Sequence, residues 1–229
     1  MSEEFGPRNS LLSRDGILWH MAKGNIIIDP YNPDKLKTVS YDLALGSCYY
    51  ASFPESESNG FIYNPWDEKS VREFWGEPRH AKTAGELFND SQIPNGIRAE
   101  DKVIILKPNE LVLCHTEEFI GGKFRTTGMM KARSSMGRSG ISVCKCAGWG
   151  DVGYTNRWTM EIQNGLPILN ILIVGESVAQ LVFFQVDPVD KDDYVSESGK
   201  YQTETDLEKI KKNWKPEDML PKLWKDREK

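Results

Sequence analysis

A chain of 229 residues, 39% of them hydrophobic, can bury one sizeable core, so its length and composition favour a single domain. Its 29 basic and 34 acidic residues give a formal net charge of -5, which excludes a general electrostatic attraction for nucleic acid or for an anionic membrane surface. No apolar stretch approaches the length of a membrane span, and the N-terminal "MSEEFGPRNS" is polar where a signal peptide needs an apolar core. We therefore expect a cytoplasmic protein with no membrane or nucleic-acid partner, in which a local basic cluster holds any anionic ligand.

The cysteines and histidines are few and scattered. Four cysteines are too few and too irregularly spaced for a disulfide framework, so reduced thiols are expected. Cys144 and Cys146 form a C-x-C pair, but a zinc site needs two further ligands. The three histidines stand apart, with no H-x-E or C-x-x-C motif beside them. We expect no zinc.

The N-terminal part predicts one helix followed by strands. Residues 13–24 begin with a capping-type serine, carry apolar residues at helical spacing and end at a glycine, which predicts a short helix. The β-branched run in 25–36 and the alternating "SYDLALGSCYYASF" of 40–53 predict strands. From 54 to 100 the apolar periodicity fades into a polar, Trp-containing region with signals for two short helices. We interpret this region as an insertion or elaborate loop rather than a separate domain.

Strand patterns resume after the insertion. In "KVIILKPNELVLCHTEEF", residues 107–110 form a turn between two apolar runs, which predicts a hairpin. Two more strands are expected at 157–164 and 179–186, on either side of "LPILNILIVGES". Many short strands with turn signals between them predict a mostly-β barrel or sandwich over residues 1–188. The charged remainder, 189–229, is expected to be a tail with a helix near 206–214, otherwise mobile or packed on a neighbouring subunit.

Glu161 occupies the middle of a predicted strand. Successive side chains of a strand alternate between its two faces, so Glu161 shares a face with Thr159, while Trp158 and Met160 point the other way. A carboxylate at such a position is either a solvated surface residue or a partly desolvated base with a raised pKa. Spacing alone leaves both interpretations open.

Two polar segments precede this strand. "RSSMGRSG" sets Arg133 and Arg138 around hydroxyls and glycines, a group that can bind phosphate oxygens but that also occurs in ordinary surface loops. Asp151 and Tyr154, in "GDVGY", are expected in a tight turn. That turn is either part of a binding site or a hairpin with an exposed aromatic residue.

The run from 131 to 164 resembles the dCTP deaminases, a branch of the trimeric dUTPase superfamily. Those enzymes carry G-R-S-S-x-x-R-x-G, then A-x-x-I-D-P-G-[FW], then a strand ending L-E-x-x-N, and no gap is needed to match them here. The corresponding residues are Arg133, Ser134, Ser135, Arg138, Gly140, Ala147, Asp151, Gly153, Tyr154, Glu161 and Asn164. Beyond the run, "SYDLALG", "LKPNELVLCHTEE" and "AQLVFFQV" are similar to other strand motifs of the family. The resemblance covers nearly everything except the insertion and the distal tail.

The resemblance implies a dUTPase-like distorted β-barrel of jelly-roll type with short helices and a charged C-terminal tail that closes over a neighbouring active site. It also implies a homotrimer whose active sites are shared between subunits. The implied reaction is hydrolytic deamination of dCTP to dUTP and ammonia, by a water that a glutamate activates without zinc. Mg²⁺ would accompany the triphosphate.

The resemblance also assigns catalytic and base-binding roles. Glu161 corresponds to the general base that takes a proton from the water attacking C4 of cytosine and passes it to N3 and the leaving amine. Ser134 and Arg138 correspond to the residues that position this water and the glutamate. The main chain near Ala147 would bind the pyrimidine edge, and Asp151 would bind the 3′-hydroxyl of the sugar.

Phosphate contacts are assigned in the same way. Arg133, Ser134 and Ser135, with Arg138 beside them, correspond to ligands of the triphosphate. Lys200 matches a tail motif that folds over the phosphates, and Tyr194 matches a tyrosine a few residues before it.

The chain departs from the family pattern at several positions. Gly150 and Val152 replace an Ile and a Pro, and Glu204 falls near an expected tail glutamine. Tyr154, counted among the substrate-binding residues, replaces a Phe or Trp and completes a D-x-x-Y like that of dUTPases. "CKC" at 144–146 replaces the segment that mediates thymidine triphosphate feedback in relatives, so retention of feedback stays open. The alternatives are a dUTP diphosphatase, a bifunctional enzyme, or a catalytically silent nucleotide-binding protein.

Overall fold

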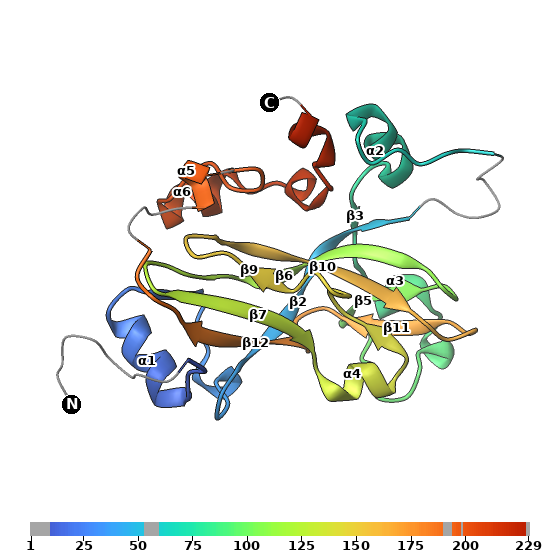
Figure 1. The fold of residues 1–229 in the computed structure, drawn as a ribbon. Coiled ribbons are helices and arrows are strands. Elements are labelled where there is room, and N and C mark those ends of the chain that lie inside the picture. Colours follow the sequence, from blue (N-terminus) through green and yellow to red (C-terminus); the bar gives the residue numbers. More distant parts are fainter. Residues whose placement is uncertain (1–9, 53–59, 190–193, 198, 228–229) are drawn as a thin grey trace.

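Antiparallel strands make up most of the structured chain, and short helices lie around them (Figure 1). The structure is a computed structural model, and it describes residues 10–52, 60–189, 194–197 and 199–227. The strands are β1 (Ile26–Asp29), β2 (Tyr41–Ala51), β3 (Arg79–His80), β4 (Lys82–Thr83), β5 (Lys102–Leu106), β6 (Leu111–Gly122), β7 (Thr126–Ala132), β8 (Ile141–Ser142), β9 (Trp149–Gly150), β10 (Thr155–Asn164), β11 (Asn170–Ile173) and β12 (Ser177–Gln185). The expectation of a mostly-β protein is confirmed.

The larger sheet curls into a distorted barrel. Its strands follow the order β8-β10-β6-β2-β12-β7-β9, with β1 added beside β6 and β3 beside β2. The register shifts between Arg157 and Thr159 in β10 and between Leu45 and Tyr49 in β2. Such irregularities bend a strand and increase its twist, which lets the sheet curl. A smaller sheet, β11-β5-β4, accompanies the barrel, so the distorted β-barrel expected from the sequence is present.

The expected hairpin over residues 102–119 is wrong. A turn does separate the two runs, with Glu110 N donating to Lys107 O over 3.1 Å and Asn109 at a φ of 60°. However, β5 pairs with β11 and β4, while β6 pairs with β10, β2 and β1. The pairing of β5 with β11 places Ile104 opposite Leu172, both buried. Burial of apolar side chains therefore favours the pairing of β5 with β11, which is distant in sequence, over pairing with the adjacent strand β6.

The helices are short and lie outside the sheets. They comprise α1 (Arg14–Ala22), η1 (Pro33–Lys35), α2 (Glu68–Trp75), α3 (Ala84–Leu87), η3 (Asp90–Gln92), α4 (Ser134–Arg138), α5 (Tyr194–Glu197), α6 (Leu207–Asn213), η4 (Pro216–Met219) and η5 (Leu223–Arg227). Helix α1 confirms the prediction at the N-terminus, with the Ser13 side chain accepting from Gly16 N and Gly24 following at a φ of 74°. Among the described residues, no helix has both the length and the apolar character needed to cross a membrane.

The main core lies inside the barrel. Side chains of β10 alternate as expected, with Trp158, Met160 and Ile162 buried, while Thr159 and Glu161 are only partly buried. The largest fully buried side chains include Tyr41, Phe183 and Met130, contributed by three different strands. Because side chains alternate along β10, its apolar side chains point into the core and Glu161 points to the opposite face of the strand.

A second core joins the insertion to the tail. It contains Cys48 and Tyr50 of β2, Leu113 of β6, Val71 and Trp75 of α2, and Met219 and Leu220 of the tail. The described part of the tail therefore packs on its own chain, because its apolar side chains find an apolar partner surface there. A tail position over a neighbouring subunit was expected from the resemblance. That position stays a prediction. Within the single chain the tail covers the sheet next to β10 (Figure 1).

Candidate active site

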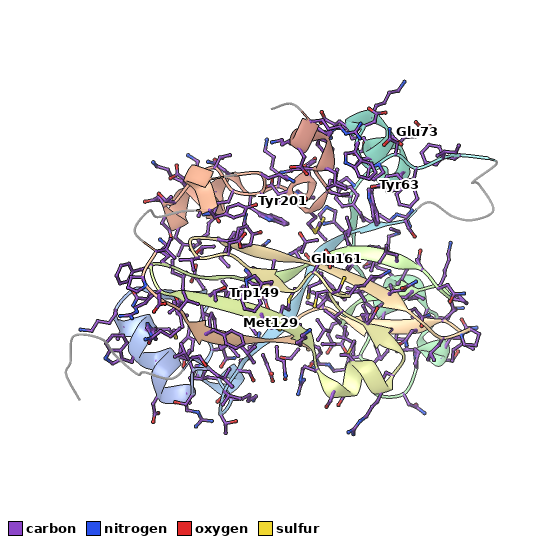
Figure 2. All side chains as sticks on the ribbon, in the orientation of Figure 1. Tyr63, Glu73, Met129, Trp149, Glu161 and Tyr201 are labelled. Carbon is purple, nitrogen blue, oxygen red and sulfur yellow. The ribbon has the colours of Figure 1, made fainter. Side chains whose placement is uncertain are left out.

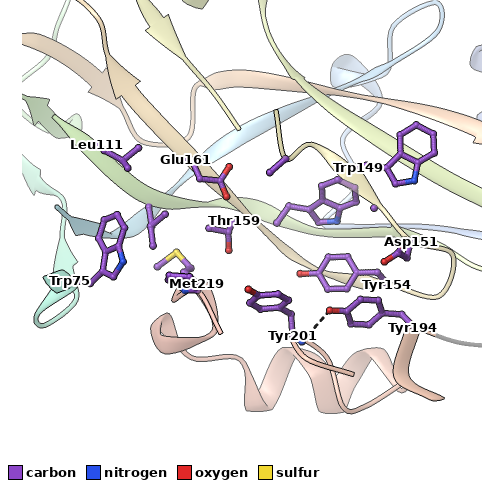
Figure 3. A pocket seen from close by; sticks show the side chains of 15 residues that line it. Trp75, Leu111, Trp149, Asp151, Tyr154, Thr159, Glu161, Tyr194, Tyr201 and Met219 are labelled. Carbon is purple, nitrogen blue, oxygen red and sulfur yellow. Dashed lines mark hydrogen bonds between the residues drawn. The ribbon is translucent and has the colours of Figure 1, made fainter. Parts of the chain in front are cut away.

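A pocket of about 460 Å³ lies between the sheet and the tail, beside β10 (Figures 2 and 3). Strands β6, β9 and β10, the end of α2 and the tail all contribute to its lining. It brings together five residues that the sequence nominated, namely Ala147, Asp151, Tyr154, Glu161 and Tyr194. The crowding of polar residues between 147 and 161 thus corresponds to one side of a real cavity.

Glu161 projects from the middle of β10 into this pocket (Figure 3). Its Oε2 atom is buried and has no hydrogen-bond partner among the described residues. Burial raises the pKa of Glu161 above its ordinary value, and the cationic Lys145 offsets only part of this effect. Glu161 is therefore a partly desolvated carboxylate, and its interpretation as a solvated surface residue is wrong. Such a group can accept a proton and hold it during a reaction.

The turn before β10 carries Asp151 and Tyr154. It is closed by Tyr154 N donating to Asp151 O over 3.1 Å, and Gly153, at a φ of 92°, donates to Gly122 O over 2.8 Å. Asp151 is exposed at the pocket, while Tyr154 is half-buried. Burial raises the pKa of the Tyr154 hydroxyl, so this hydroxyl stays protonated. The interpretation of Tyr154 as the exposed aromatic residue of an ordinary hairpin turn is therefore wrong.

Ala147 reaches the pocket through an unusual backbone segment. Cys144 and Lys145 adopt positive φ angles of 53° and 38°, and Ala147 N donates to Cys144 O over 2.8 Å. Gly148 O then accepts from Met130 N over 2.7 Å, which ties the segment to β7. This left-handed turn brings the main chain of Ala147 to the pocket that also holds Glu161.

Tyrosines of the tail complete the same end of the pocket. Tyr194 meets Tyr154 edge to face, with ring centroids 5.1 Å apart. The Tyr194 hydroxyl accepts from Tyr201 N over 3.2 Å, and Tyr194 N donates to Val152 O over 3.3 Å. Tyr201 also lines the pocket. Val152, one of the departures from the family pattern, thus provides an anchor for the tail.

Several lining residues were not nominated from the sequence. They are Trp75, Leu111, Leu113, Trp149, Gly150, Trp158, Thr159, Tyr201, Met219 and Pro221. Thr159 lies two residues before Glu161 on the same face of the strand, so strand parity could have found it. Trp75 and Met219 are large apolar residues in otherwise polar segments, which is only a weak sequence signal for a buried position. They reach β10 because the insertion packs against the tail.

The predicted phosphate ligands lie elsewhere in the chain. Ser134, Ser135 and Arg138 are exposed on α4, which lies on the side of the barrel away from the tail (Figure 1). Arg133 precedes α4, and its Nη1 donates to Ser177 O over 3.1 Å. The single chain therefore does not bring these four residues to Glu161.

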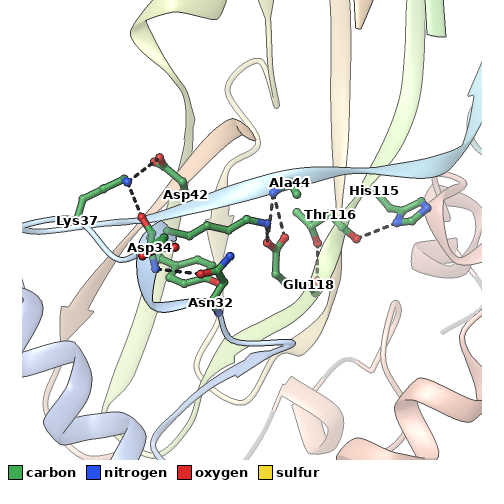
Figure 4. Close-up of polar contacts among 10 residues, drawn as sticks. Asn32, Asp34, Lys37, Asp42, Ala44, His115, Thr116 and Glu118 are labelled. Carbon is green, nitrogen blue, oxygen red and sulfur yellow. Dashed lines mark hydrogen bonds and ion pairs between the residues drawn. The ribbon is translucent and has the colours of Figure 1, made fainter. Parts of the chain in front are cut away.

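Asp42 holds Arg133 at the start of α4. Its Oδ2 lies 3.7 Å from Arg133 Nε and 3.9 Å from Lys37 Nζ. Asp42 is buried in β2, where the neighbouring Glu118 of β6 accepts from Ala44 N over 3.1 Å (Figure 4). The "SYDLALG" strand thus supplies a fixed carboxylate that orients one of the predicted phosphate ligands.

Lys200 also lies outside the pocket of Glu161. Its Nζ forms an ion pair with Asp226 Oδ1 over 2.5 Å, and it lines a separate polar cavity of about 170 Å³ together with Tyr201 and Lys222. Among the described residues, no group of three or more His, Cys, Asp or Glu side chains is placed to hold a metal ion.

Comparison with known proteins identifies the family. A family model described as dCTP deaminase-like matches residues 11–186. The chain belongs to the dCTP deaminase-like family. The predicted resemblance is confirmed, and the match ends before the tail residues that line the pocket.

Two curated proteins illustrate the relatives of this dCTP deaminase-like protein. The protein named dCTP deaminase, dUMP-forming, of Methanopyrus kandleri is 38% identical over 197 residues, covering 84% of this chain and 90% of its own. The protein of the same name from Methanobrevibacter smithii is 29% identical over 177 residues, covering 76% of this chain and 79% of its own.

A solved structure supports the fold. The 2′-deoxycytidine 5′-triphosphate deaminase of Agrobacterium tumefaciens aligns with a TM-score of 0.54 at 16% identity. The alignment covers 78% of this chain and 49% of the Agrobacterium chain, so this chain spans about half the length of that protein.

Proposed function

We propose that this protein hydrolyses the 4-amino group from the cytosine of dCTP, with Glu161 as the general base. The observation that carries the proposal is the buried, unpaired Oε2 of Glu161 in a pocket shared with Ala147 and Asp151. A carboxylate with a raised pKa is suited to proton transfer near neutral pH. The choice of dCTP as the substrate is supported by the match to the dCTP deaminase-like family and by the names of the relatives, which include dCTP.

We propose the following reaction in this pocket. Glu161 takes a proton from a water molecule, whose oxygen attacks C4 and forms a tetrahedral adduct. Glu161 passes that proton to N3, takes the remaining hydroxyl proton and delivers it to the amine, which leaves as ammonia. The balance is dCTP plus water to dUTP plus ammonia, and Glu161 ends the cycle ionised. In this arrangement the main chain of Ala147 binds the pyrimidine edge, Asp151 the 3′-hydroxyl, and Tyr154 and Tyr194 enclose the nucleoside.

The phosphate side of the site comes from a second subunit in this proposal. Arg133, Ser134, Ser135 and Arg138 are too far from Glu161 in one chain, so a homotrimer would place α4 of one subunit beside the pocket of the next. There Ser134 and Arg138 would position the water, and the guanidinium groups would bind the triphosphate with its Mg²⁺. Lys200 would add a further cation from the tail. The four unpaired thiols fit a cytoplasmic protein.

A second candidate function is deamination followed by hydrolysis of dUTP to dUMP and pyrophosphate. Two observations favour it. The relatives are named dUMP-forming, and Asp151 and Tyr154 of the D-x-x-Y sequence both reach the pocket. dUTP, expected from the sequence as the product, would then be an intermediate.

Product analysis tests both functions. Purified protein is incubated with dCTP and Mg²⁺, and ammonia, dUTP, dUMP and pyrophosphate are measured. Ammonia with dUTP supports deamination, and ammonia with dUMP and pyrophosphate supports the bifunctional enzyme. Pyrophosphate from dUTP without ammonia from dCTP would identify a dUTP diphosphatase, and nucleotide binding without any product would identify a silent binding protein. Glu161→Gln should abolish ammonia release while dCTP still binds, whereas the exposed Glu117→Gln should retain it.

A further inference from the structure

The pocket extends beyond Glu161 into an apolar chamber. We define the apolar chamber by Trp75, Leu111, Leu113 and Met219, all of which line the pocket. Trp75, Leu111 and Met219 lie on one side of Glu161, while Asp151 and Tyr154 lie on the other side (Figure 3). None of the four side chains carries a charge. The pocket therefore has a polar half suited to a nucleoside and an apolar half beyond the reacting position.

Strand pairing places this chamber directly beside the carboxylate. In the register of β6 and β10, Leu113 is the partner of Glu161 and Leu111 is the partner of Gln163. Directly opposed residues of antiparallel strands lie on the same face, with their Cβ atoms about 4.5–5.5 Å apart. The leucine side chains are consequently immediate neighbours of the site of proton transfer.

The outer walls of the chamber are preformed. Trp75 is 6% exposed and Met219 is 4% exposed, and both belong to the second core together with Tyr50 and Leu220. Helix α2 is fixed at its start by Asp67, whose side chain accepts from the main chain of Lys69 and Ser70. Because both walls are packed from behind, the chamber is a built part of the pocket rather than a gap that collapses on binding.

The orientation of the base decides what enters the chamber. This step rests on the proposed function, in which Glu161 faces C4, Ala147 faces the N3 edge and Asp151 faces the sugar. C5 then points past Glu161, away from Ala147 and toward Leu113. We propose that the preferred substrate is a deoxycytidine nucleotide with a small alkyl substituent at C5, which the apolar chamber binds.

Substrate comparison on the unmodified protein gives the first test. The values of kcat/KM for ammonia release are measured for dCTP, 5-methyl-dCTP and 5-hydroxymethyl-dCTP. Burying one methyl group in an apolar site favours 5-methyl-dCTP over dCTP by about fourfold. The hydroxymethyl compound is the matched comparison: the buried Nε1 of Trp75 has no hydrogen-bond partner among the described residues and is the one donor among the four chamber side chains, while the other three only desolvate the added hydroxyl. Equal or weaker use of 5-methyl-dCTP relative to dCTP would overturn the proposal, as would a preference for the hydroxymethyl compound.

Variants of the chamber give the second test. Leu111→Phe fills the chamber, so it should lower the ratio of kcat/KM for 5-methyl-dCTP to that for dCTP by fivefold or more, on the order of the discrimination that one methylene provides. A methyl group also alters the reactivity of C4, but this effect cancels when the ratio is compared between variants. Leu18→Phe, on an exposed position of α1, serves as the matched control and should leave the ratio unchanged. An unchanged ratio in Leu111→Phe would contradict the assignment of the chamber.

Binding separates this inference from the proposed function. With Glu161→Gln, the dissociation constants of dCTP and 5-methyl-dCTP are measured by calorimetry, and the methylated nucleotide should bind about fourfold more tightly. If no cytosine nucleotide yields ammonia with the unmodified protein, the proposed function fails. If dCTP is deaminated but the methyl group brings no advantage in turnover or binding, the proposed function stands and the chamber proposal fails.

Discussion

Gly150 of β9 leaves room for the indole ring of Trp158 in β10. A Cβ atom on Gly150 would lie 2.3 Å from Cη2 of Trp158, far inside van der Waals contact. Trp158 is held in place by its Nε1, which donates to Ile120 O over 2.7 Å. Gly150 is therefore matched to a tryptophan in the strand that follows it in the chain, and the turn before β10 is shaped by this pair.

Gly150→Ala should destabilise the protein by about 1–3 kcal/mol, the usual cost of overpacking a well-filled site. The free energy of unfolding is measured by chemical denaturation. Gly137→Ala is the matched control, because its Cβ would meet nothing within 4 Å. If both substitutions cost the same, the close approach of Gly150 to Trp158 is not what requires the glycine.

Glu161 should make stability depend on pH in an unusual direction. Burial raises its pKa above the ordinary 4.5, so the folded protein binds this proton more tightly than the unfolded chain. The stability linked to this group is present below pH 4.5 and is lost as the pH rises through the raised pKa. Glu161→Gln removes the titration, so the variant should be more stable than the unmodified protein at pH 8, and the difference should vanish near pH 4. Denaturation curves across this range check the prediction, with Glu117→Gln as the control. A Glu161→Gln variant less stable at pH 8 would contradict it.

Mixing two inactive variants tests whether sites are shared between subunits. Glu161→Gln lacks the base and Arg138→Ala lacks a residue of α4, so each should be inactive alone. In randomly mixed copies of the proposed trimer, about one quarter of the sites should combine an intact Glu161 with an intact Arg138 from the neighbouring subunit. Ammonia release after co-refolding should therefore recover to about one quarter of the unmodified level. Each variant refolded alone is the control, and a mixture that stays inactive would contradict a shared site.

Arg157 links the tail to the barrel. Its guanidinium carbon lies 4.9 Å from the ring centroid of Phe119 and 4.7 Å from that of Trp214. His115 also packs against Trp214, with centroids 4.7 Å apart, and burial lowers the pKa of His115 to about 4, so this ring is neutral at neutral pH. The sandwich around Arg157 is thus a specific attachment point for residues that follow α6.

Trp214→Ala should loosen the tail and weaken the pocket that Tyr201 and Met219 help to line. A desolvated cation–π contact is worth about 1–2 kcal/mol, so amide hydrogen exchange in 199–227 should accelerate by roughly tenfold, and KM for dCTP should rise. Trp19→Ala on α1 is the control and should leave exchange in the tail unchanged. Unaltered exchange in Trp214→Ala would show that other contacts hold the tail.

Much of the fold and one side of the site could be predicted from the sequence. Alternation in β10 placed Glu161 opposite the apolar row, and the motif between Arg133 and Asn164 identified the family. The hairpin of 102–119 could not be predicted correctly, because a local turn signal does not specify which distant strand supplies the best buried partner. The contributions of Trp75 and Met219 were equally hidden, since both lie in polar segments whose positions depend on packing against each other.

By itself, the amino-acid sequence determined the strand content, the parity of Glu161 and the family, because these depend on local periodicity and on the order of residue types. The tertiary structure alone decided that Glu161 is desolvated, that an apolar chamber lies beside it, and that α4 faces away from it in the same chain. These properties arise from contacts between segments far apart in sequence. Burial, and with it the pKa of a carboxylate, is a property of the assembled neighbours rather than of the residue.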